Sequence, residues 1–505
     1  MDGTKDPGNH HIEQCVVENP KDQDLRPVPT ALMDWSLEER ERREKALVRK
    51  IDIRLLIMML VMYILNYLDR NNIAAAKLAG LQDDLNLKGE EYQVCVSILF
   101  VGYLLMQVVP SNMILNKFGK PSIYLPSCMV VWGVISCSTA ATQGFGGLLA
   151  VRFFLGFVEA AYFPGCLYLL SAWYTRKELV KRTALLYAGS LISGAFSGLI
   201  SAGITSGLNG ARGIAAWRWL FIIEGALTIF VALFAFFIVP NLPRTTPWLS
   251  HDEKALAAWR LEEDIGEDDW VDSEHQSMFH GAKLAILDPK TWLLLGVIYG
   301  CTSSGAVTTF FPSVMSGLGK NNIDTLLLTT PPYLIGTIIV LIHAWNADRT
   351  GERYLHLCLP PIFAIVSFIL YMAGNNFAAR YVAMCIMLGS IYASYVVALG
   401  YISNILPRPA AKRAAALALI NCLSNVAQIY TPYLYPDSAA PRYITAFSVN
   451  IAMCAMTIIF STVLRIYLRR LNKKLDQEEG ADLFMYAGIS EGPEVAANRG
   501  FRFLL

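Results

Sequence analysis

Charged residues are scarce in this chain. Only 16% of its 505 residues are Asp, Glu, Lys or Arg, whereas 54% are hydrophobic. The formal net charge is +1, so the chain lacks the basic excess that proteins use to bind nucleic acid. The first residues show no basic start followed by an apolar run, and we therefore expect no cleavable signal peptide. A composition this apolar is typical of an integral membrane protein rather than a soluble enzyme.

Metal-ligand spacings are also missing from the sequence. The ten cysteines are scattered, mostly inside apolar stretches, and no CxxC pair or His/Cys ligand spacing occurs. We interpret these cysteines as small hydrophobic residues. We therefore expect no metal site, no disulfide framework and no cofactor.

Apolar segments of helical length recur along the chain. About 20 apolar residues are enough to cross a bilayer as a helix. The predicted segments are 53–75, 92–115, 123–142, 147–173, 183–206, 217–239, 292–315, 326–346, 355–374, 381–405, 413–433 and 444–465. A hydrophilic stretch separates the sixth segment from the seventh. We therefore predict an all-α membrane protein with twelve transmembrane helices in two bundles of six.

This pattern divides the chain into five parts. They are an N-terminal tail at 1–52, a six-helix bundle at 53–239, a middle loop at 240–291, a second six-helix bundle at 292–465 and a C-terminal tail at 466–505. Lys and Arg gather before the first span, after the last one, and in the loops after the fourth and tenth spans. Because cytoplasmic loops carry an excess of these residues, we expect both termini and the middle loop in the cytoplasm.

Two hydrophilic segments carry the pattern that begins a helix. Ser36 is followed three residues later by Glu39, and Ser250 by Glu253, and both pairs are capping boxes. The first predicts a charged helix at 36–50 that leads into the first span. The second predicts a short helix in the middle loop. We interpret that loop as a solvated tether between the bundles, with a regulatory domain as the alternative.

Four charged residues lie inside the predicted spans. Asp69 and Arg70 are in the first span, and Arg152 and Glu159 are in the fourth. Each costs about 2.5–3.5 kcal/mol at the centre of an inserted helix, so we expect all four to face protein or a watered cavity. Arg152 and Glu159 are two helical turns apart and share one face, where we expect Arg152 to offset the charge of Glu159. Asp69 and Arg70 point about 100° apart, toward different surroundings.

Two interpretations of these charges remain open. They could form a membrane-embedded relay, in which the carboxylates gain and lose protons and a guanidinium group holds an anion. The alternative is a buried ion-pair network with a purely structural role.

The second bundle offers uncharged polar groups in place of acids and bases. Tyr392 lies in the tenth span, and Asn421, Asn425 and Gln428 lie in the eleventh. The last three step by four and three residues, so we expect them to form one polar stripe. Such a stripe could recognise a substrate, or it could simply hydrogen-bond neighbouring helices.

A short basic turn with a glycine occurs at equivalent places in the two predicted bundles. The turns follow the second and the eighth spans and contain Asn116, Lys117 and Gly119 in the first bundle, and Asp348, Arg349, Gly351 and Arg353 in the second. The two glycines are separated by nearly the same number of residues as the first and seventh spans. This repetition predicts two six-helix pseudo-repeats, related by an axis along the membrane normal.

The turn from Asp348 to Arg353, in a protein with two bundles and a long middle loop, resembles the signature of the major facilitator superfamily. Asn116 stands where that signature has aspartate. Further motifs are similar to those of the anion:cation symporter family, specifically its fungal allantoate-permease branch. These motifs are Asn66-Tyr-Leu-Asp-Arg-Asn-Asn-Ile73, Arg152-Phe-Phe-Leu-Gly-Phe-Val-Glu-Ala160 and Trp217-Arg-Trp-Leu-Phe-Ile-Ile-Glu-Gly225.

The resemblance implies a proton-coupled symporter that imports a small organic anion by alternating access. The branch carries allantoate, nicotinate, pantothenate and biotin, and a monomer in the plasma membrane is implied. Bacterial sugar-acid members of the family use matching carboxylates for protons and a matching arginine for the substrate. The roles assigned on this basis are proton coupling by Asp69, Glu159 and Arg152, substrate binding by Arg70, Asn421, Asn425, Gln428 and Tyr392, and conformational switching by the two glycine turns. Glu224, in the third motif, is interpreted as structural.

Three alternatives remain. A proton-driven exporter is disfavoured, because the fifth span lacks a proline-bearing glycine motif. Gly194 and Gly198 in that span predict close helix packing instead. A membrane-embedded enzyme would need converging His/Asp or Cys/His groups, which the sequence does not show. A nutrient sensor would be expected to carry a longer signalling tail.

Overall fold

The computed structural model describes residues 32, 35–107, 120–265, 278–406 and 410–485, and every regular element among them is a helix. The elements before residue 240 are α2 (Leu37–Ile51), η2 (Asp52–Leu56), α3 (Ile57–Leu78), α4 (Leu81–Asp84), α5 (Glu91–Gln107), α7 (Pro121–Thr139), α8 (Phe145–Glu159), α9 (Tyr162–Ser171), α10 (Arg176–Gly207), η3 (Ala211–Gly213) and α11 (Ala216–Ile238). The middle segment contains η4 (Pro243–Thr245), α12 (His251–Ile265) and α14 (Met278–Leu287).

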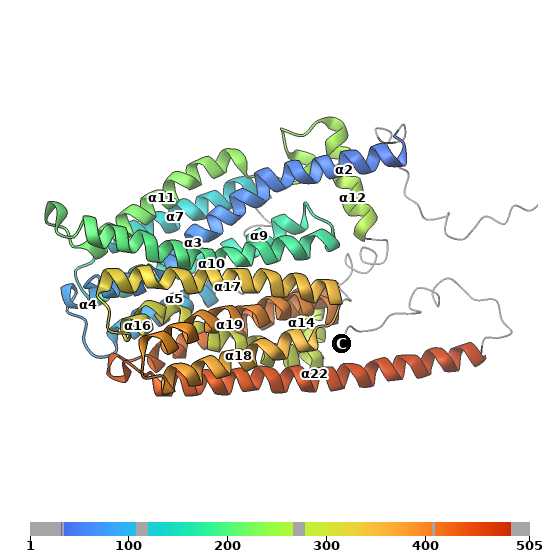
Figure 1. Ribbon diagram of the computed structural model, residues 1–505. Coiled ribbons are helices and arrows are strands. Elements are labelled where there is room, and N and C mark those ends of the chain that lie inside the picture. Colours follow the sequence, from blue (N-terminus) through green and yellow to red (C-terminus); the bar gives the residue numbers. More distant parts are fainter. Residues whose placement is uncertain (1–31, 33–34, 108–119, 266–277, 407–409, 486–505) are drawn as a thin grey trace, which may run out of the picture.

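The rest of the described chain forms the second half. Its elements are α15 (Pro289–Gly305), η5 (Ala306–Phe310), α16 (Phe311–Ser316), α17 (Asn322–Thr350), α18 (Tyr354–Ala373), α19 (Phe377–Ile405), α20 (Ala410–Asn425), α21 (Ala427–Tyr430), η6 (Thr431–Leu434), η7 (Asp437–Ala439) and α22 (Ile444–Met485). In Figure 1, α3, α7, α10 and α11 of the first half lie above α17, α18, α19 and α22 of the second. We call the end of this bundle that contains α4 the α4 end, and the opposite end, with α2 and α12, the α12 end (Figure 1).

Ten stretches of helix in the described residues are long and apolar enough to cross a membrane. Two predicted segments do not reach that length. Helix α5 is apolar but has 17 residues, and residues 108–115 of its predicted segment lie outside the described part of the chain. Helix α20 has 16 residues. The prediction of an all-α, multi-pass membrane protein is therefore confirmed, while the count of twelve spans stays a prediction.

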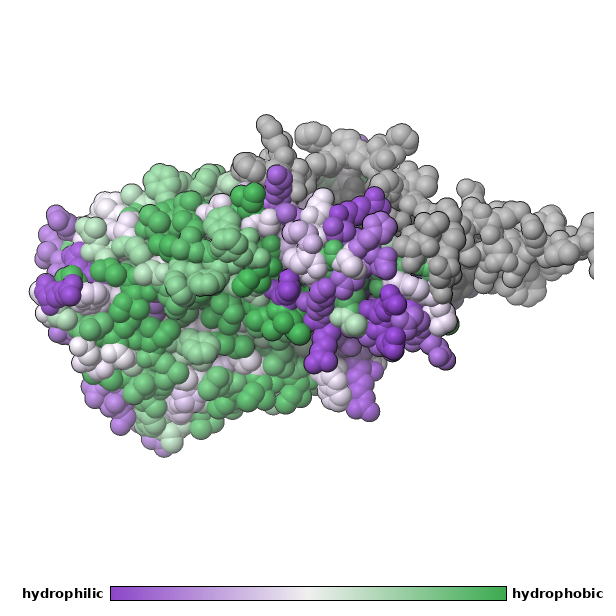
Figure 2. Space-filling view, turned by 90° about the horizontal axis from the view of Figure 1, so that it is seen from above, coloured by the Kyte–Doolittle hydropathy of each residue, from purple (hydrophilic) through white to green (hydrophobic). Residues whose placement is uncertain are grey.

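An apolar belt surrounds the bundle. Figure 2 shows hydrophobic side chains over the middle of the molecule and hydrophilic side chains at its two ends. Helix α11 illustrates the cause: Phe230, Phe234 and Phe237 are exposed at helical spacing, and Phe237 is 87% exposed. On the opposite side of this helix, Glu224 and Thr228 are fully buried. A helix with an apolar outside and polar groups inside is suited to contact with lipid.

Helices α10 and α17 pack closely along the boundary between the two halves (Figure 1). A methyl group at Gly194 would overlap the ring of Tyr333. One at Gly198 would lie 2.7 Å from the carbonyl oxygen of Leu326. The predicted role of these two glycines in close helix packing is thus confirmed, and the packing they allow is between the halves.

The predicted capping box is complete at α12, whereas at α2 the Ser36 cap is formed and the Glu39 carboxylate pairs with Arg42 and Arg43. The Ser36 hydroxyl accepts a hydrogen bond from the backbone N–H of Glu39 at 3.3 Å. At α12, the Glu253 N–H donates to the Ser250 hydroxyl at 3.2 Å, and the Ser250 N–H donates to the Glu253 carboxylate at 2.9 Å. Both predicted helices, at 36–50 and in the middle loop, are therefore confirmed.

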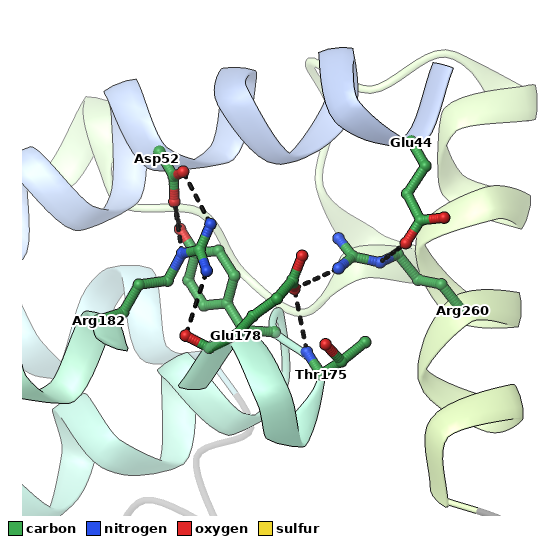
Figure 3. Close-up of polar contacts among 7 residues, drawn as sticks. Glu44, Asp52, Thr175, Glu178, Arg182 and Arg260 are labelled. Carbon is green, nitrogen blue, oxygen red and sulfur yellow. Dashed lines mark hydrogen bonds and ion pairs between the residues drawn. The ribbon is translucent and has the colours of Figure 1, made fainter. Parts of the chain in front are cut away.

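The interpretation of the middle loop as a solvated tether is wrong for α12. Arg260 of this helix is 3% exposed and bridges Glu44 of α2 and Glu178 of α10 (Figure 3). A second contact joins α12 to α2: the Lys50 ammonium group of α2 donates to the Glu253 carboxylate of α12 at 2.8 Å. Helix α12 therefore packs against the first half at the α12 end, because Arg260 and Glu253 form ion pairs with residues of α2 and α10.

Candidate functional site

A buried ion pair lies inside the first half. Arg70 Nε donates to Glu159 Oε2 at 2.8 Å, and their side chains are 10% and 0% exposed. Glu159 is the last residue of α8, and the chain makes a turn at Ala160–Ala161 before α9 begins. The turn interrupts the fourth predicted span at the point where the Glu159 carboxylate meets Arg70 of α3. Glu159 Oε1 has no hydrogen-bond partner, so Arg70 alone compensates this buried charge directly.

Two tyrosines flank the guanidinium group of Arg70. The rings of Tyr67 and Tyr103 each lie 4.9 Å from its central carbon atom. This arrangement stabilises a buried cation through the negative faces of the rings. Tyr392 of the second half lies within electrostatic range of the same group. The charge of Arg70, whose side chain is 10% exposed, therefore acts across the boundary between the halves.

Asp69 faces the opposite way, into the first half. Ser136 of α7 donates to its Oδ1 at 2.7 Å, and Thr228 of α11 donates to its Oδ2 at 2.7 Å. The predicted divergence of Asp69 and Arg70 is confirmed. Sequence reasoning did not name the two hydroxyl residues, although both are polar side chains within predicted apolar spans.

Arg152 does act on Glu159 as expected, but the direct partner of Glu159 is Arg70. Arg152 Nη2 donates to the backbone carbonyl of Arg70 at 3.1 Å, while its Nε and Nη1 atoms have no partner. Arg70 instead forms the ion pair with Glu159, because α3 brings it between the two charged positions of α8. Arg152 acts on Glu159 only at longer range.

The polar residues of the second half bond mainly within that half. The α-helix is interrupted at Val426, whose φ of −57° and ψ of −29° stay in the right-handed helical region, and the stripe of Asn421, Asn425 and Gln428 stays a prediction. Asn425 donates to the carbonyl and side-chain oxygens of Asn421 at 2.8 and 3.1 Å, whereas Gln428 donates to the Thr302 carbonyl of α15 at 3.3 Å. The Tyr392 hydroxyl lies 3.4 Å from the hydroxyl of Thr308. The roles of these residues in substrate binding stay predictions.

The second of the predicted switch turns has the expected shape. Gly351 ends α17 with φ of 69°, a conformation that favours glycine, and Arg353 donates to Asp348 across the turn at 2.9 Å. The Arg349 guanidinium group lies 5.4 Å from the ring centre of Trp345. The first turn, with Asn116, Lys117 and Gly119, lies outside the described residues.

The hydrogen bonds between described residues of the two halves lie toward the α4 end. Lys77 pairs with Asp437 at 2.5 Å, and Asn322 donates to the Leu78 carbonyl at 2.8 Å. Further inside, Thr330 donates to the Ala195 carbonyl at 3.2 Å, and Ser97 donates to the Ile429 carbonyl at 2.7 Å. The halves are therefore joined at the α4 end, and they also meet where the rings of Tyr187 of α10 and Tyr395 of α19 lie 5.8 Å apart.

Residues 59–432 match the model of the Major Facilitator Superfamily. The MFS transporter prlL of a fungal species is 32% identical over 460 residues, which cover 88% of this chain and 91% of that protein. The MFS-type transporter efuF of Hormonema carpetanum is 31% identical over 438 residues, which cover 86% of this chain and 87% of that protein.

Solved structures share the fold at low sequence identity. The proton:xylose symporter XylE, bound to 6-bromo-6-deoxy-D-glucose, aligns with a TM-score of 0.63 and 14% identity over 82% of this chain and 95% of its own. A bacterial homolog of the human lysosomal transporter Spinster, in an inward-facing and unoccupied conformation, aligns with a TM-score of 0.59 and 14% identity over 81% of this chain and 94% of its own. Taken with the apolar helical bundle and the joined halves, these matches lead to one conclusion: the chain belongs to the Major Facilitator Superfamily of membrane transporters.

Proposed function

We propose that this transporter imports a small organic anion together with protons, by alternating access. The observation that carries the proposal is the single ion pair between Arg70 and Glu159. A guanidinium group binds a carboxylate through two parallel hydrogen bonds, and Glu159 uses only the Nε donor of Arg70. A substrate carboxylate is therefore a fitting replacement for Glu159 as the partner of Arg70.

Protonation of Glu159 couples the two ligands in this mechanism. The neutral acid no longer holds Arg70 by charge, so a proton on Glu159 releases the guanidinium group for the substrate anion. Departure of the substrate leaves Arg70 without a partner, which favours loss of the proton and return of the ion pair. Because each ligand favours binding of the other, proton and anion cross the membrane together.

We assign the α12 end to the cytoplasm, in keeping with the distribution of Lys and Arg. The joined layer at the α4 end then closes the path from outside, and the conformation is inward-facing. We propose that α5 and α20 complete twelve spans, and that the protein works as a monomer in the plasma membrane. The substrate class follows the family resemblance: a vitamin or ureide carboxylate such as nicotinate, pantothenate, biotin or allantoate.

An uptake screen tests this proposal. Proteoliposomes with an inward proton gradient would be offered labelled nicotinate, pantothenate, biotin and allantoate. We expect one of these acids to accumulate, and its neutral amide to fail as a competitor. Full competition by the amide would contradict anion binding at Arg70. Accumulation only when the gradient is reversed would identify an exporter, the second candidate.

The Arg70→Lys variant examines the binding group itself. An ammonium group cannot make the planar two-bond contact with a carboxylate, so the variant should bind the transported acid more weakly. Arg469→Lys, an exposed position on α22, is the matched control and should bind like the parent. Equal affinity in the two variants would show that Arg70 does not bind the substrate.

A further inference from the structure

Glu224 is a buried carboxyl group that the mechanism above does not use. It lies on α11 and is 1% exposed, and neither of its oxygens has a hydrogen-bond partner. A charged carboxylate in such surroundings would cost several kcal/mol, because among the described residues it has no counter-ion and only the Asn72 amide as a neighbouring donor. Its environment therefore differs from those of the other two buried acids of the first half.

A count of buried charges indicates its protonation state. Apart from Lys77, whose charge pairs with Asp437 of the second half, the described spans of the first half contain three buried acids, Asp69, Glu159 and Glu224, against two buried bases, Arg70 and Arg152. Glu159 has its ion pair and Asp69 has two hydroxyl donors. The interior is neutral when one acid holds a proton, and Glu224 is the acid whose charge is least stabilised.

Helices α3 and α11 place Glu224 close to Asp69. Asp69 and Asn72 are three residues apart on α3, and Glu224 and Thr228 are four apart on α11, so each pair shares a face. Thr228 bonds to Asp69, and Glu224 therefore lies about one turn nearer the α4 end, beside Asn72. Asp69 is the charged group that acts on Glu224 among the described residues of α3, α7 and α10, the helices packed against α11.

The Asn72 side chain is suited to hydrogen-bond with both Glu224 and Asp69. It is fully buried, and neither its amide nitrogen nor its oxygen makes a hydrogen bond of ordinary geometry in this conformation. The side chain has donors for whichever neighbouring group is charged, and an acceptor for whichever is protonated.

We propose that Glu224 and Asp69 share one transported proton, with Glu224 as the carrier nearer the α4 end. In the transfer, the O–H bond of the Glu224 acid breaks, the proton binds the Asp69 carboxylate, and Glu224 becomes the charged member of the pair. Asp69 then releases its proton toward the α12 end, and a proton from solution at the α4 end restores the Glu224 acid, so the pair again holds one proton. The number of buried charges is the same before and after the transfer, so no additional buried charge is created. This proposal rests on the proposed function, proton-coupled transport, and adds Glu224 to it as a proton carrier.

Infrared spectroscopy of the full-length protein tests the protonated state without any substrate. The parent should show the C=O stretching band of a buried carboxylic acid, and Glu224→Gln should lose it. The exposed Glu90→Gln, at the start of α5, is the control and should keep the band. Glutamine has the shape of the neutral acid, so the variant should fold. A band that persists in Glu224→Gln, or a variant that does not fold, would overturn the proposal.

A transport assay separates proton transfer from a structural role. The probe is whichever of nicotinate, pantothenate, biotin or allantoate the parent accumulates. Glu224→Gln should retain counterflow but lose accumulation driven by a proton gradient, and Glu224→Asp should restore part of it. Parent-like accumulation by Glu224→Gln would overturn the proposal and leave Glu224 as a structural acid. If the parent accumulates none of the four acids, the proposed function fails, while the infrared band still decides whether Glu224 is protonated.

Discussion

Lys77 of α3 and Asp437 of η7 form a 2.5 Å ion pair that joins the two halves at the α4 end. The Lys77 ammonium group also lies 4.6 Å from the centre of the Tyr92 ring. The side chain of Lys77 is 9% exposed, whereas that of Asp437 is 62% exposed. Solvent therefore screens the pair, and its contribution is in the range of about 0.2–1 kcal/mol.

Breaking this pair should favour opening at the α4 end. In Lys77→Met, the ratio of open to closed molecules should rise by up to about fivefold, which corresponds to 1 kcal/mol. Spin labels at Ser206 and Ile323 would report the distance between the halves at this end. The exposed Lys88→Met is the control and should leave the distance distribution unchanged. An unchanged distribution in Lys77→Met would mean that the pair does not hold the closed state.

Glu159→Gln should uncouple proton movement from substrate movement. Glutamine imitates the protonated acid, so Arg70 stays free for the anion at every pH. We expect the parent to bind substrate more weakly as the pH rises, because the deprotonated Glu159 then forms its ion pair with Arg70 again. The variant should bind with little dependence on pH and should catalyse counterflow without accumulation.

Paired measurements in proteoliposomes check this prediction. Counterflow of labelled substrate reports exchange, and uptake under an inward proton gradient reports coupling. If Glu159→Gln still concentrates substrate like the parent, Asp69 becomes the candidate for the coupling residue.

Asp348→Asn should impair transport more than Asn116→Asp, at equal amounts of protein in the membrane. The first change removes the carboxylate that pairs with Arg353 across the turn after α17. The second acts in a turn that already departs from the family signature. Initial rates of uptake would decide the order. The reverse order would place control of the conformational equilibrium in the first-half turn.

Docking of α12 should weaken in acid. Burial alone would raise the pKa of Glu253, but hydrogen bonds from Lys50 and from the Ser250 backbone outweigh it and hold the pKa below its ordinary value of 4.5. A lowered pKa in the docked state means that the stabilisation is complete above pH 4.5 and is lost as the pH falls through the lower, docked value.

Hydrogen exchange of the α12 backbone, corrected for the intrinsic effect of pH, measures this change. Protection should fall on acidification in the parent. In Lys50→Met, protection should already be lower at neutral pH and should change less with pH. Equal pH dependence in both proteins would show that the Lys50–Glu253 contact does not cause the acid effect.

Much of the architecture could be predicted from composition and periodicity. Within the described residues the apolar segments coincide with helices, serine caps begin α2 and α12, and the angle between Asp69 and Arg70 follows from helix geometry. These features depend on residues close together in the sequence. Hydrophobicity alone did not reveal the interruption of the α-helix at Val426, inside the eleventh apolar segment.

Pairing between distant residues was decided by the tertiary structure. The sequence by itself determined that charges at 69, 70, 152 and 159 must avoid lipid, since burying them there is costly. It did not determine that Glu159 meets Arg70 rather than Arg152, or that Ser136 and Thr228 bind Asp69. Those partners depend on which faces of α3, α7, α8 and α11 meet and at what depth, and packing of the helices sets both.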